Sequence, residues 1–341
     1  MTPVRTIVVG AGHLGTIHTR LLTQNQRFLV AAVVEPNATT RERIEKELGV
    51  RTYERIDHVK EDFSAAIIAT PTIHHHKSAL PLIHQGIHCL IEKPLALTVE
   101  QATALVRAAQ KRDVVLQVGH NERFNAAFVA AKKHLPLASF IETVRTSSYT
   151  FRSTDVGVVL DLMIHDLDLV LSLVNSDVAK VSAFGRAVIG PHEDFAHARL
   201  EFENGCVANL SASRCSFERQ RQIRWYSEDG FVTADLDAGS VALISVPGWV
   251  QQGMHDMLSV SSEEQSRLKQ CFFTEILPRS CESVTPINAI EAEHHDFCDA
   301  IRQHRLPLVD GEAGHAALLV ANQILEQIQL TSEKSYPLRA A

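Results

Sequence analysis

The strongest constraint on the fold is a regular alternation of apolar and helix-like segments across the first 120 residues. The short segments 6–10, 28–34, 65–69, 88–91 and 114–118 are almost entirely hydrophobic. Helix-like segments lie between them, at residues 14–23, 39–48, 72–85 and 99–112. Strands that are apolar on both faces belong to parallel sheets that helices cover on both sides. We therefore expect an α/β fold whose first domain, residues 1–120, is a doubly wound parallel sheet.

The pattern changes after residue 120. Strand-like segments follow one another at residues 139–151, 180–189, 195–202, 206–215 and 222–227, and several alternate with period two. Glu203-Asn204-Gly205 forms a hairpin turn between two of them. Helices are expected at 156–174, 289–304 and 312–329. Residues 121–341 should therefore form a second α/β domain with a mainly antiparallel sheet, in which 250–285 shows no clear pattern.

Composition excludes several classes of protein. The net charge of -7 argues against binding to nucleic acid or to an anionic membrane. No apolar run is long enough to span a bilayer, and the N-terminus lacks a signal-peptide pattern. The six cysteines form no CxxC pair, which is typical of a reduced, cytoplasmic protein. The adjacent histidines 74–76 point in different directions, so we expect no metal site.

A glycine-rich segment follows the first strand. Gly10, Gly12 and Gly15 form a GxGxxG pattern that opens a helix at His13 and Leu14. Glu35 ends the second strand and could accept hydrogen bonds from the adenine ribose, whereas its charge would repel a 2′-phosphate. This context predicts binding of NAD rather than NADP. The alternative is a glycine turn in a protein that binds no nucleotide.

Ligands in such folds lie at the carboxyl ends of the strands. Three segments emerge there, at 69–72, 92–94 and 119–121. Lys93, fixed by the following proline, is expected beside the nicotinamide. The alternative is a surface ion pair between Lys93 and Glu92.

The segment VVLDLMIHDLDLV, residues 158–170, is apolar on most of a helix yet contains a histidine and three aspartates. At about 100° per residue, Asp161, His165 and Asp168 form one stripe. Asp166 lies off the stripe and is expected at the surface or between domains. We interpret the stripe as a cavity wall in which His165 exchanges a proton. A satisfied His–Asp pair in the core is the alternative.

Together these motifs resemble the glucose–fructose oxidoreductase / inositol dehydrogenase / MocA family. The resemblance rests on GAGHLG (10–15), ATPTIHH (69–75), GIHCLIEKP (86–94) and DLMIHDLD (161–168). It implies a Rossmann domain followed by a domain with an open-faced sheet, and NAD(P)-linked oxidation of a sugar or polyol. By resemblance the catalytic residues are Lys93, Asp161 and His165. The cofactor contacts it implies extend to Thr70, Pro71, His75 and Glu92.

Residues 119–128, GHNERFNAAF, resemble members that act on UDP-linked sugars, including UDP-N-acetylglucosamine 3-dehydrogenases. Arg123 and Asn125 are expected near the substrate, and Arg145, Arg152 and Arg214 are candidates for contacts with a diphosphate. Reduction of another carbonyl compound, oxidation of a free polyol, a glycosidase with bound NAD and a non-catalytic NAD-sensing regulator remain alternatives. One face of the second sheet, near Asn209, Ser211 and Ser213, is expected to support a homodimer or homotetramer.

Overall fold

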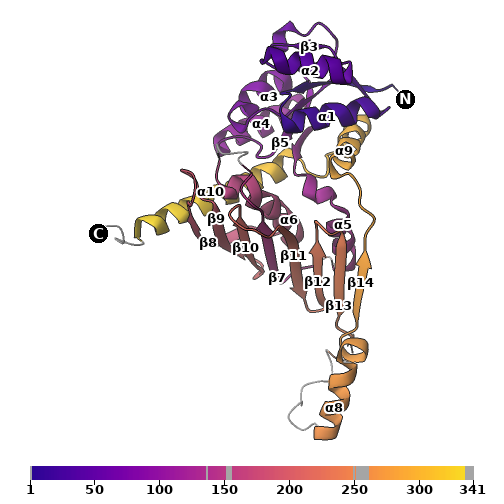
Figure 1. The fold of residues 1–341 in the computed structure, drawn as a ribbon, viewed down its shortest axis with the longest axis vertical. Helices are drawn as coiled ribbons and strands as arrows, with labels where there is room; N and C mark the ends of the chain where they lie inside the picture. The colour runs from indigo at the N-terminus through magenta and orange to yellow at the C-terminus, as the bar shows by residue number, and fades with distance from the viewer. Residues whose placement is uncertain (1, 136, 151–155, 249, 251–260, 335–341) are drawn as a thin grey trace. The chain divides into compact units, whose positions relative to one another are not determined.

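The computed structural model describes residues 2–334, except for residues 136, 151–155, 249 and 251–260. Its contacts divide the chain into two compact units. Unit 1 contains residues 1–124 and 288–322, and unit 2 contains residues 125–287 and 323–341. Figure 1 shows the elements of both units.

Unit 1 is built on a six-stranded parallel sheet with the strand order β3-β2-β1-β4-β5-β6. The strands are β1 (Val4–Val9), β2 (Phe28–Val34), β3 (Thr52–Tyr53), β4 (Ala65–Ile68), β5 (His88–Glu92) and β6 (Leu116–Gly119). The five strands expected from apolar segments are confirmed. The sequence analysis did not find β3, because this edge strand is two residues long and half-buried.

Helices connect these strands and complete the doubly wound arrangement. They are α1 (His13–Gln24), α2 (Ala38–Leu48), α3 (His75–His84) and α4 (Val99–Arg112), with short 3-10 turns η1 (Ile56–His58), η2 (Thr72–His74) and η3 (Asn121–Phe124). Local signals fix their ends. Asn37 caps α2 by accepting a hydrogen bond from the Thr40 backbone N–H, and Gly49 ends it in a left-handed conformation.

The C-terminal part of the chain returns to unit 1. Helix α9 (Ala289–Gln303) and the first part of α10 (Gly311–Lys334) belong to this unit up to residue 322. Phe297 and Cys298 of α9 are completely buried in the same hydrophobic cluster as Val8, Leu22 and Phe28. This differs from the expected second domain of residues 121–341, because an amphipathic helix can be assigned from sequence more readily than the core that it covers.

Unit 2 is built on an eight-stranded mixed sheet with the order β14-β13-β12-β11-β7-β10-β9-β8. Only β7 and β10 pair in parallel, and all other neighbours are antiparallel. The strands are β7 (Phe140–Thr146), β8 (Val178–Arg186), β9 (Phe195–Phe202), β10 (Val207–Ser213), β11 (Gln220–Ser227), β12 (Gly230–Asp235), β13 (Ser240–Ser245) and β14 (Arg279–Ser283).

Alternation along these strands separates two faces of the sheet. In β9, Ala196, Ala198, Leu200 and Phe202 are buried, as their period of two predicted. Helices α5 (Ala126–His134) and α6 (Ile164–Val174) pack on this sheet, and α8 (Ser262–Cys271) extends beyond the ends of β13 and β14 (Figure 1). A π-helical turn, η5 (Phe272–Ile276), follows α8. The fold class expected from the sequence is confirmed for both units.

Candidate active site

The loop between β1 and α1 has the geometry of a phosphate-binding turn. Gly10 has φ +93, and a Cβ there would lie 2.7 Å from the Ala69 carbonyl oxygen. A Cβ on Gly15 would lie 1.9 Å from the Gly10 oxygen, whereas a Cβ on Gly12 would meet nothing within 4 Å. Helix α1 begins at His13 with no side chain capping its first turn. The loop is therefore packed tightly except where a pyrophosphate would approach free N–H groups.

A cleft of about 790 Å³ opens beside this loop in unit 1. It is lined from the carboxyl ends of β1, β2 and β4 and from α3, which is where a doubly wound sheet binds its ligand. Thr70 Oγ1 is buried, has no hydrogen-bond partner among the described residues, and belongs to a residue that lines the cleft. The volume lies within the range of about 300–1,000 Å³ typical of small-molecule sites. The loop, the cleft and the Thr70 hydroxyl fit a bound dinucleotide.

Glu35 is held at the end of β2 by the backbone. Its two carboxylate oxygens accept hydrogen bonds from the Ala11 and Asn37 N–H groups, each at 2.9 Å. Two arginines reach the same region from α2. Arg41 donates to the Glu35 carbonyl at 2.8 Å, and Arg43 donates to Thr16 Oγ1 at 3.2 Å. The carboxylate is thus fixed beside the glycine loop, with two cations close to it.

His75 links the ends of two strands. Its Nδ1 lies 2.9 Å from the Pro94 oxygen and its Nε2 lies 2.9 Å from the Thr70 oxygen. Burial lowers the pKa of His75, and the contacts with the two carbonyl oxygens oppose this shift. His75 therefore connects the loop after β4 to the loop after β5. Its direct contact with a cofactor, like that of the exposed Pro71, stays a prediction.

Glu92 and Lys93 at the end of β5 have different environments. Glu92 is buried, and its Oε1 lies 2.7 Å from His18 Nε2. Burial alone would raise the pKa of Glu92, but the hydrogen bond and charge of His18 outweigh burial and lower it. Lys93 is half-buried, and its backbone N–H donates to Glu92 Oε2 at 3.3 Å. Glu92 faces the interior of unit 1, so it does not form an ion pair at the surface.

Several residues that line the cleft of unit 1 were not predicted. They come from η1, η2 and α3 and include charged side chains: Arg55, His74 and Lys77. They belong to no recognisable sequence motif, because the segments that follow β3 and β4 contain no characteristic residue pattern. Lys77 lies one helical turn beyond His74, and that spacing was the available signal.

The helix that contains Asp161 begins differently from the expectation. Residues Val159–Met163 form a π-helical turn, η4, and α6 follows directly. Glu193 caps this end: its Oε1 accepts a hydrogen bond from the Val159 N–H at 3.1 Å. A Cβ on Gly157 would lie 2.0 Å from the same carboxylate oxygen, so a larger residue there would require the Glu193 side chain to move. The uniform 100° step does not hold across this segment, and π turns occur often at functional sites.

The aspartates of the helix have distinct roles. Asp161 is half-buried in η4, and His165 is half-buried in the first turn of α6. Asp166 was expected at the surface or between domains, and this was wrong. Its Oδ1 accepts hydrogen bonds from Arg145 Nε at 3.0 Å and Nη2 at 2.7 Å, and both residues are 2% exposed. A buried guanidinium needs such a partner, so Asp166 serves Arg145. Asp168 is also buried.

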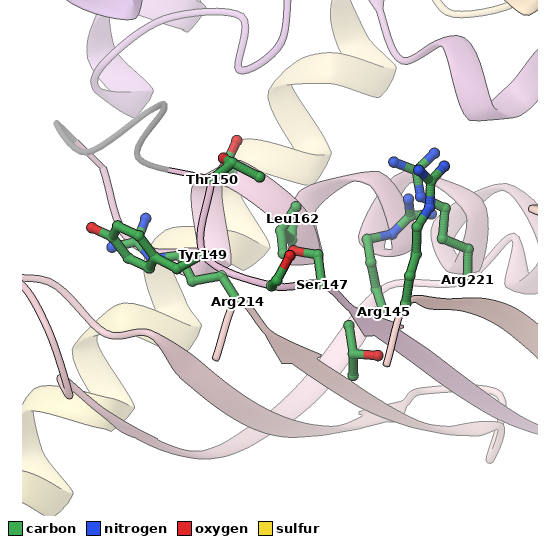
Figure 2. A pocket seen from close by; sticks show the side chains of 11 residues that line it. Arg145, Ser147, Tyr149, Thr150, Leu162, Arg214 and Arg221 are labelled. Carbon is green, nitrogen blue, oxygen red and sulfur yellow. The ribbon is translucent and has the colours of Figure 1, made fainter. Parts of the chain in front are cut away.

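Figure 2 shows a pocket of about 190 Å³ in unit 2, at the end of β7. Four arginines line it, and Asp161 is the only carboxylate among its described lining residues: Arg145, Thr146, Ser147, Ser148, Tyr149, Thr150, Asp161, Leu162, Arg214, Arg219 and Arg221. Arg145 and Arg221 are cross-strand neighbours, and their guanidinium groups gather at one end of the pocket. Arg214 lies at the other end, 5.2 Å from the centre of the Tyr149 ring.

Arg214 is fixed by a buried aspartate. Asp194 is 0% exposed and accepts a hydrogen bond from Arg214 Nε at 2.8 Å. Burial opposes ionisation of Asp194, but hydrogen bonds from the Ile189 and Val188 amides and from Arg214 bring its pKa down to about 2. The sequence analysis did not find Asp194, Arg219 or Arg221, because nothing near them forms a motif.

The remaining substrate candidates are not among the residues that line this pocket. Asn125 caps α5 through Oδ1, and its Nδ2 donates to the Leu236 carbonyl at 2.9 Å. Arg123 is half-buried in η3 of unit 1. Neither residue lines the pocket of Figure 2, and Arg152 lies outside the described residues. Among the described helices, none is both long enough and apolar enough to cross a membrane.

The parallel sheet, the glycine loop and the cleft at the strand ends define a dinucleotide-binding oxidoreductase of the Rossmann type. Residues 4–120 match the oxidoreductase family with an NAD-binding Rossmann fold, and residues 136–233 match the GFO/IDH/MocA C-terminal domain. The chain belongs to the Gfo/Idh/MocA family of NAD-binding oxidoreductases, whose characterised relatives oxidise CH–OH groups.

Three relatives place the chain within this family. UDP-N-acetylglucosamine 3-dehydrogenase of Acidithiobacillus ferrooxidans is 33% identical over 95% of this chain and 97% of that protein. A solved structure of that enzyme has a TM-score of 0.84, with 97% of this chain and 99% of that chain covered. Scyllo-inositol 2-dehydrogenase (NAD+) of Bacillus subtilis is 28% identical over 62% and 68% of the two chains. Glucose-6-phosphate 3-dehydrogenase of the same organism is 24% identical over 61% and 67%.

Proposed function

We propose that this protein is an NAD-dependent dehydrogenase that oxidises a secondary alcohol of an anionic sugar, with UDP-N-acetylglucosamine oxidised at C3 as the first candidate. The main support for the proposal is a pocket that is lined by Asp161 and by four arginines. Guanidinium groups recognise phosphate oxygens through charge-assisted hydrogen bonds. A carboxylate beside them can accept a hydrogen bond from a sugar hydroxyl. Two of the three relatives also act, by their names, on sugars that contain phosphate.

The size of the pocket restricts what it would hold. Its volume of about 190 Å³ is smaller than the ~300–1,000 Å³ of typical whole-ligand sites. It would therefore receive the phosphate-bearing part of a nucleotide sugar rather than the entire molecule. Two of its arginines, Arg145 and Arg214, have the buried aspartate partners Asp166 and Asp194, which hold the guanidinium groups in place before a ligand binds. Arg219 forms an exposed ion pair with Asp237.

The catalytic assignment extends the resemblance to the residues of this chain. His165 would accept the proton of the substrate hydroxyl, and Lys93 would donate a hydrogen bond to the oxygen that becomes the carbonyl. A bound nicotinamide would supply the redox chemistry by accepting hydride. General-base assistance is typically about 10²–10⁴-fold, and one such donor contributes about 3–4 kcal/mol. Asp161 orients His165 or binds a neighbouring hydroxyl. These side chains supply placement and proton transfer.

NAD is the proposed cofactor because the Glu35 carboxylate is fixed at the end of β2. A 2′-phosphate would meet this negative charge at short range. Arg41 and Arg43 reduce the repulsion, but both already donate to Glu35, Thr16 or nearby carbonyl groups. The preference for NAD should therefore be clear but not absolute.

A substrate panel tests the proposal. NAD reduction is followed at the nicotinamide absorbance with UDP-N-acetylglucosamine, glucose 6-phosphate, free N-acetylglucosamine and inositol. The proposal expects kcat/KM to be highest for UDP-N-acetylglucosamine. If a free polyol is preferred, as the inositol dehydrogenases of the family allow, the anionic-sugar assignment is wrong.

Two variants connect this preference to the pocket. Arg221 lies on the same face of β11 as the buried Ile223 and Trp225, and it lines the pocket. Arg221→Gln should raise KM for the UDP-sugar about tenfold, since a lost charged hydrogen bond costs roughly 1.5–3 kcal/mol. Arg224→Gln is the matched control, because Arg224 lies on the opposite face of the same strand. Equal effects of both substitutions would remove the pocket from substrate binding.

A further inference from the structure

A cluster of titratable side chains is enclosed in unit 1. His18 of α1, Glu92 of β5, and Glu293 and His294 of α9 are all buried, and three of them are 0% exposed. One atom each from His18, Glu92 and Glu293 lies within 4.8 Å of the other two. The carboxylate of Glu293 carries the argument, because both of its oxygens are buried without a hydrogen-bond partner among the described residues.

A proton alone does not satisfy this cluster. If His18 Nε2 carries a proton, it can donate to Glu92 Oε1 at 2.7 Å, but Glu293 still has no hydrogen-bond partner among the described residues. Burial and the nearby Glu92 raise the pKa of Glu293 well above its usual value, and neither of its oxygens has a hydrogen-bond partner in the part of the chain that the structure describes. An unsatisfied buried polar group costs about 1–3 kcal/mol.

We propose that His18, Glu92 and Glu293 form a structural site for a divalent metal cation, with Zn²⁺ as the best match. Two carboxylates and one dication cancel in charge, which removes the cost of burying either alone. Imidazole nitrogen and carboxylate oxygen are ordinary ligands of Zn²⁺. Since both Glu293 oxygens lack partners, this carboxylate can supply one or two ligand atoms.

The surroundings of the three side chains match those of metal ligands. His18 Nδ1 lies 2.7 Å from His294 Nε2, so a Nδ1–H group can donate to His294 and leave Nε2 to face the cation. Glu92 Oε2 accepts from the Lys93 backbone N–H. Ligands held in this way by outer hydrogen bonds are typical of metal sites.

The site would connect three elements that are distant in sequence. A cation there links α1, β5 and α9, and α9 is the helix that returns to unit 1 after residue 287. No metal site is expected from the sequence, because His18 and Glu92 are separated by 74 residues and form no local ligand motif. This proposal does not depend on the identity of the sugar substrate.

The test is to measure the metal content of the full-length protein by inductively coupled plasma mass spectrometry. The protein is purified without a polyhistidine tag. About one Zn²⁺ per chain is expected in the wild type. The cation should be lost from Glu293→Gln and His18→Gln, with a lower melting temperature. Glu291→Gln is the matched control, because Glu291 is an exposed acid on the same helix and should retain the metal.

Two results would overturn the proposal. One is a metal-free wild type whose melting temperature does not rise when Zn²⁺ or Mn²⁺ is added, together with a Glu293→Gln variant that is as stable or more stable. The other is bound metal that remains stoichiometric in Glu293→Gln, since it would then occupy another site. If neither variant folds, the metal content of the wild type and its melting temperature after chelation decide the question. Turnover of sugar plays no part in these readouts, so the proposed function is tested separately.

Discussion

Replacing Asp194 with asparagine is expected to destabilise unit 2 through the loss of one buried carboxylate. The pKa of Asp194 falls from an ordinary 3.8 to about 2 in the folded protein. These values differ by 1.8 pH units (3.8 − 2), and at ~1.36 kcal/mol per unit the ionised form stabilises the fold by about 2 kcal/mol.

The pH dependence provides the sharper test of this prediction. A group whose pKa is lowered by folding contributes fully above its unfolded pKa and loses its contribution as pH falls through the folded value. The stability difference between wild type and Asp194→Asn should therefore be constant above about pH 5 and shrink from pH 4 toward pH 2. Denaturant unfolding at a series of pH values, followed by tryptophan fluorescence, measures it, because Trp225, one of the two tryptophans of the chain, is buried in unit 2.

Asp229→Asn is the control, because Asp229 is an exposed residue of the turn between β11 and β12. It should remain close to wild type at every pH. Since Asp194 fixes Arg214, which lines the pocket, Asp194→Asn should also weaken binding of the UDP-sugar. A variant as stable as wild type at pH 7, or a deficit that does not change between pH 5 and pH 2, would refute this reasoning.

Further predictions concern the cofactor, the catalytic groups and assembly. Glu35→Ala should bring the dissociation constants of NADP and NAD closer together. If the wild type binds NADP more tightly than NAD, the assignment is contradicted. Lys93→Met should bind NAD normally and lose roughly 10²-fold in turnover, because its hydrogen bond matters most in the transition state. Asp161→Asn should lose less than Lys93→Met, as expected for a group that orients rather than transfers a proton. Light scattering at micromolar concentration should show a dimer or tetramer. A 37.7 kDa monomer would count against the prediction that the open face of the sheet in unit 2 forms a subunit interface.

The Rossmann unit could be predicted well because its signals are local. Each of its signals spans only a few residues: the strands that are apolar on both faces, the glycine turn, and the acidic residue Glu35 at the end of the second strand. Together these signals predicted the cofactor-binding loop. The hairpin at Gly205 followed in the same way: Gly205 has φ +85 and donates to the Phe202 carbonyl at 2.9 Å. The strands β3 and β14 have no apolar run, and pairing with a neighbouring strand holds them in the sheet. The strands β12 and β13 were also missed, although β12 alternates with period two and β13 contains the apolar run Val241–Ile244.

The polar groups of the site were harder to predict from sequence. Helical spacing placed Asp166 outside the stripe, but its pairing with Arg145 depends on a strand 21 residues earlier in the chain. The pocket arginines come from β7, β11 and the loops near them, and only the sheet register brings Arg145 opposite Arg221. Buried ion pairs such as Arg214–Asp194 leave no periodic pattern, because each partner is an ordinary charged residue until the fold encloses it.

The most direct test of the proposed chemistry is the turnover of His165→Ala with UDP-N-acetylglucosamine and NAD. The same sample should first be shown to be folded and to bind NAD with the affinity of the wild type, since the glycine loop and cleft lie in unit 1 and His165 lies in unit 2. The account predicts a loss of roughly 10²-fold or more in turnover, because the base that accepts the hydroxyl proton is gone. Near-normal turnover in this folded, NAD-binding variant would contradict the assignment of His165 as the base.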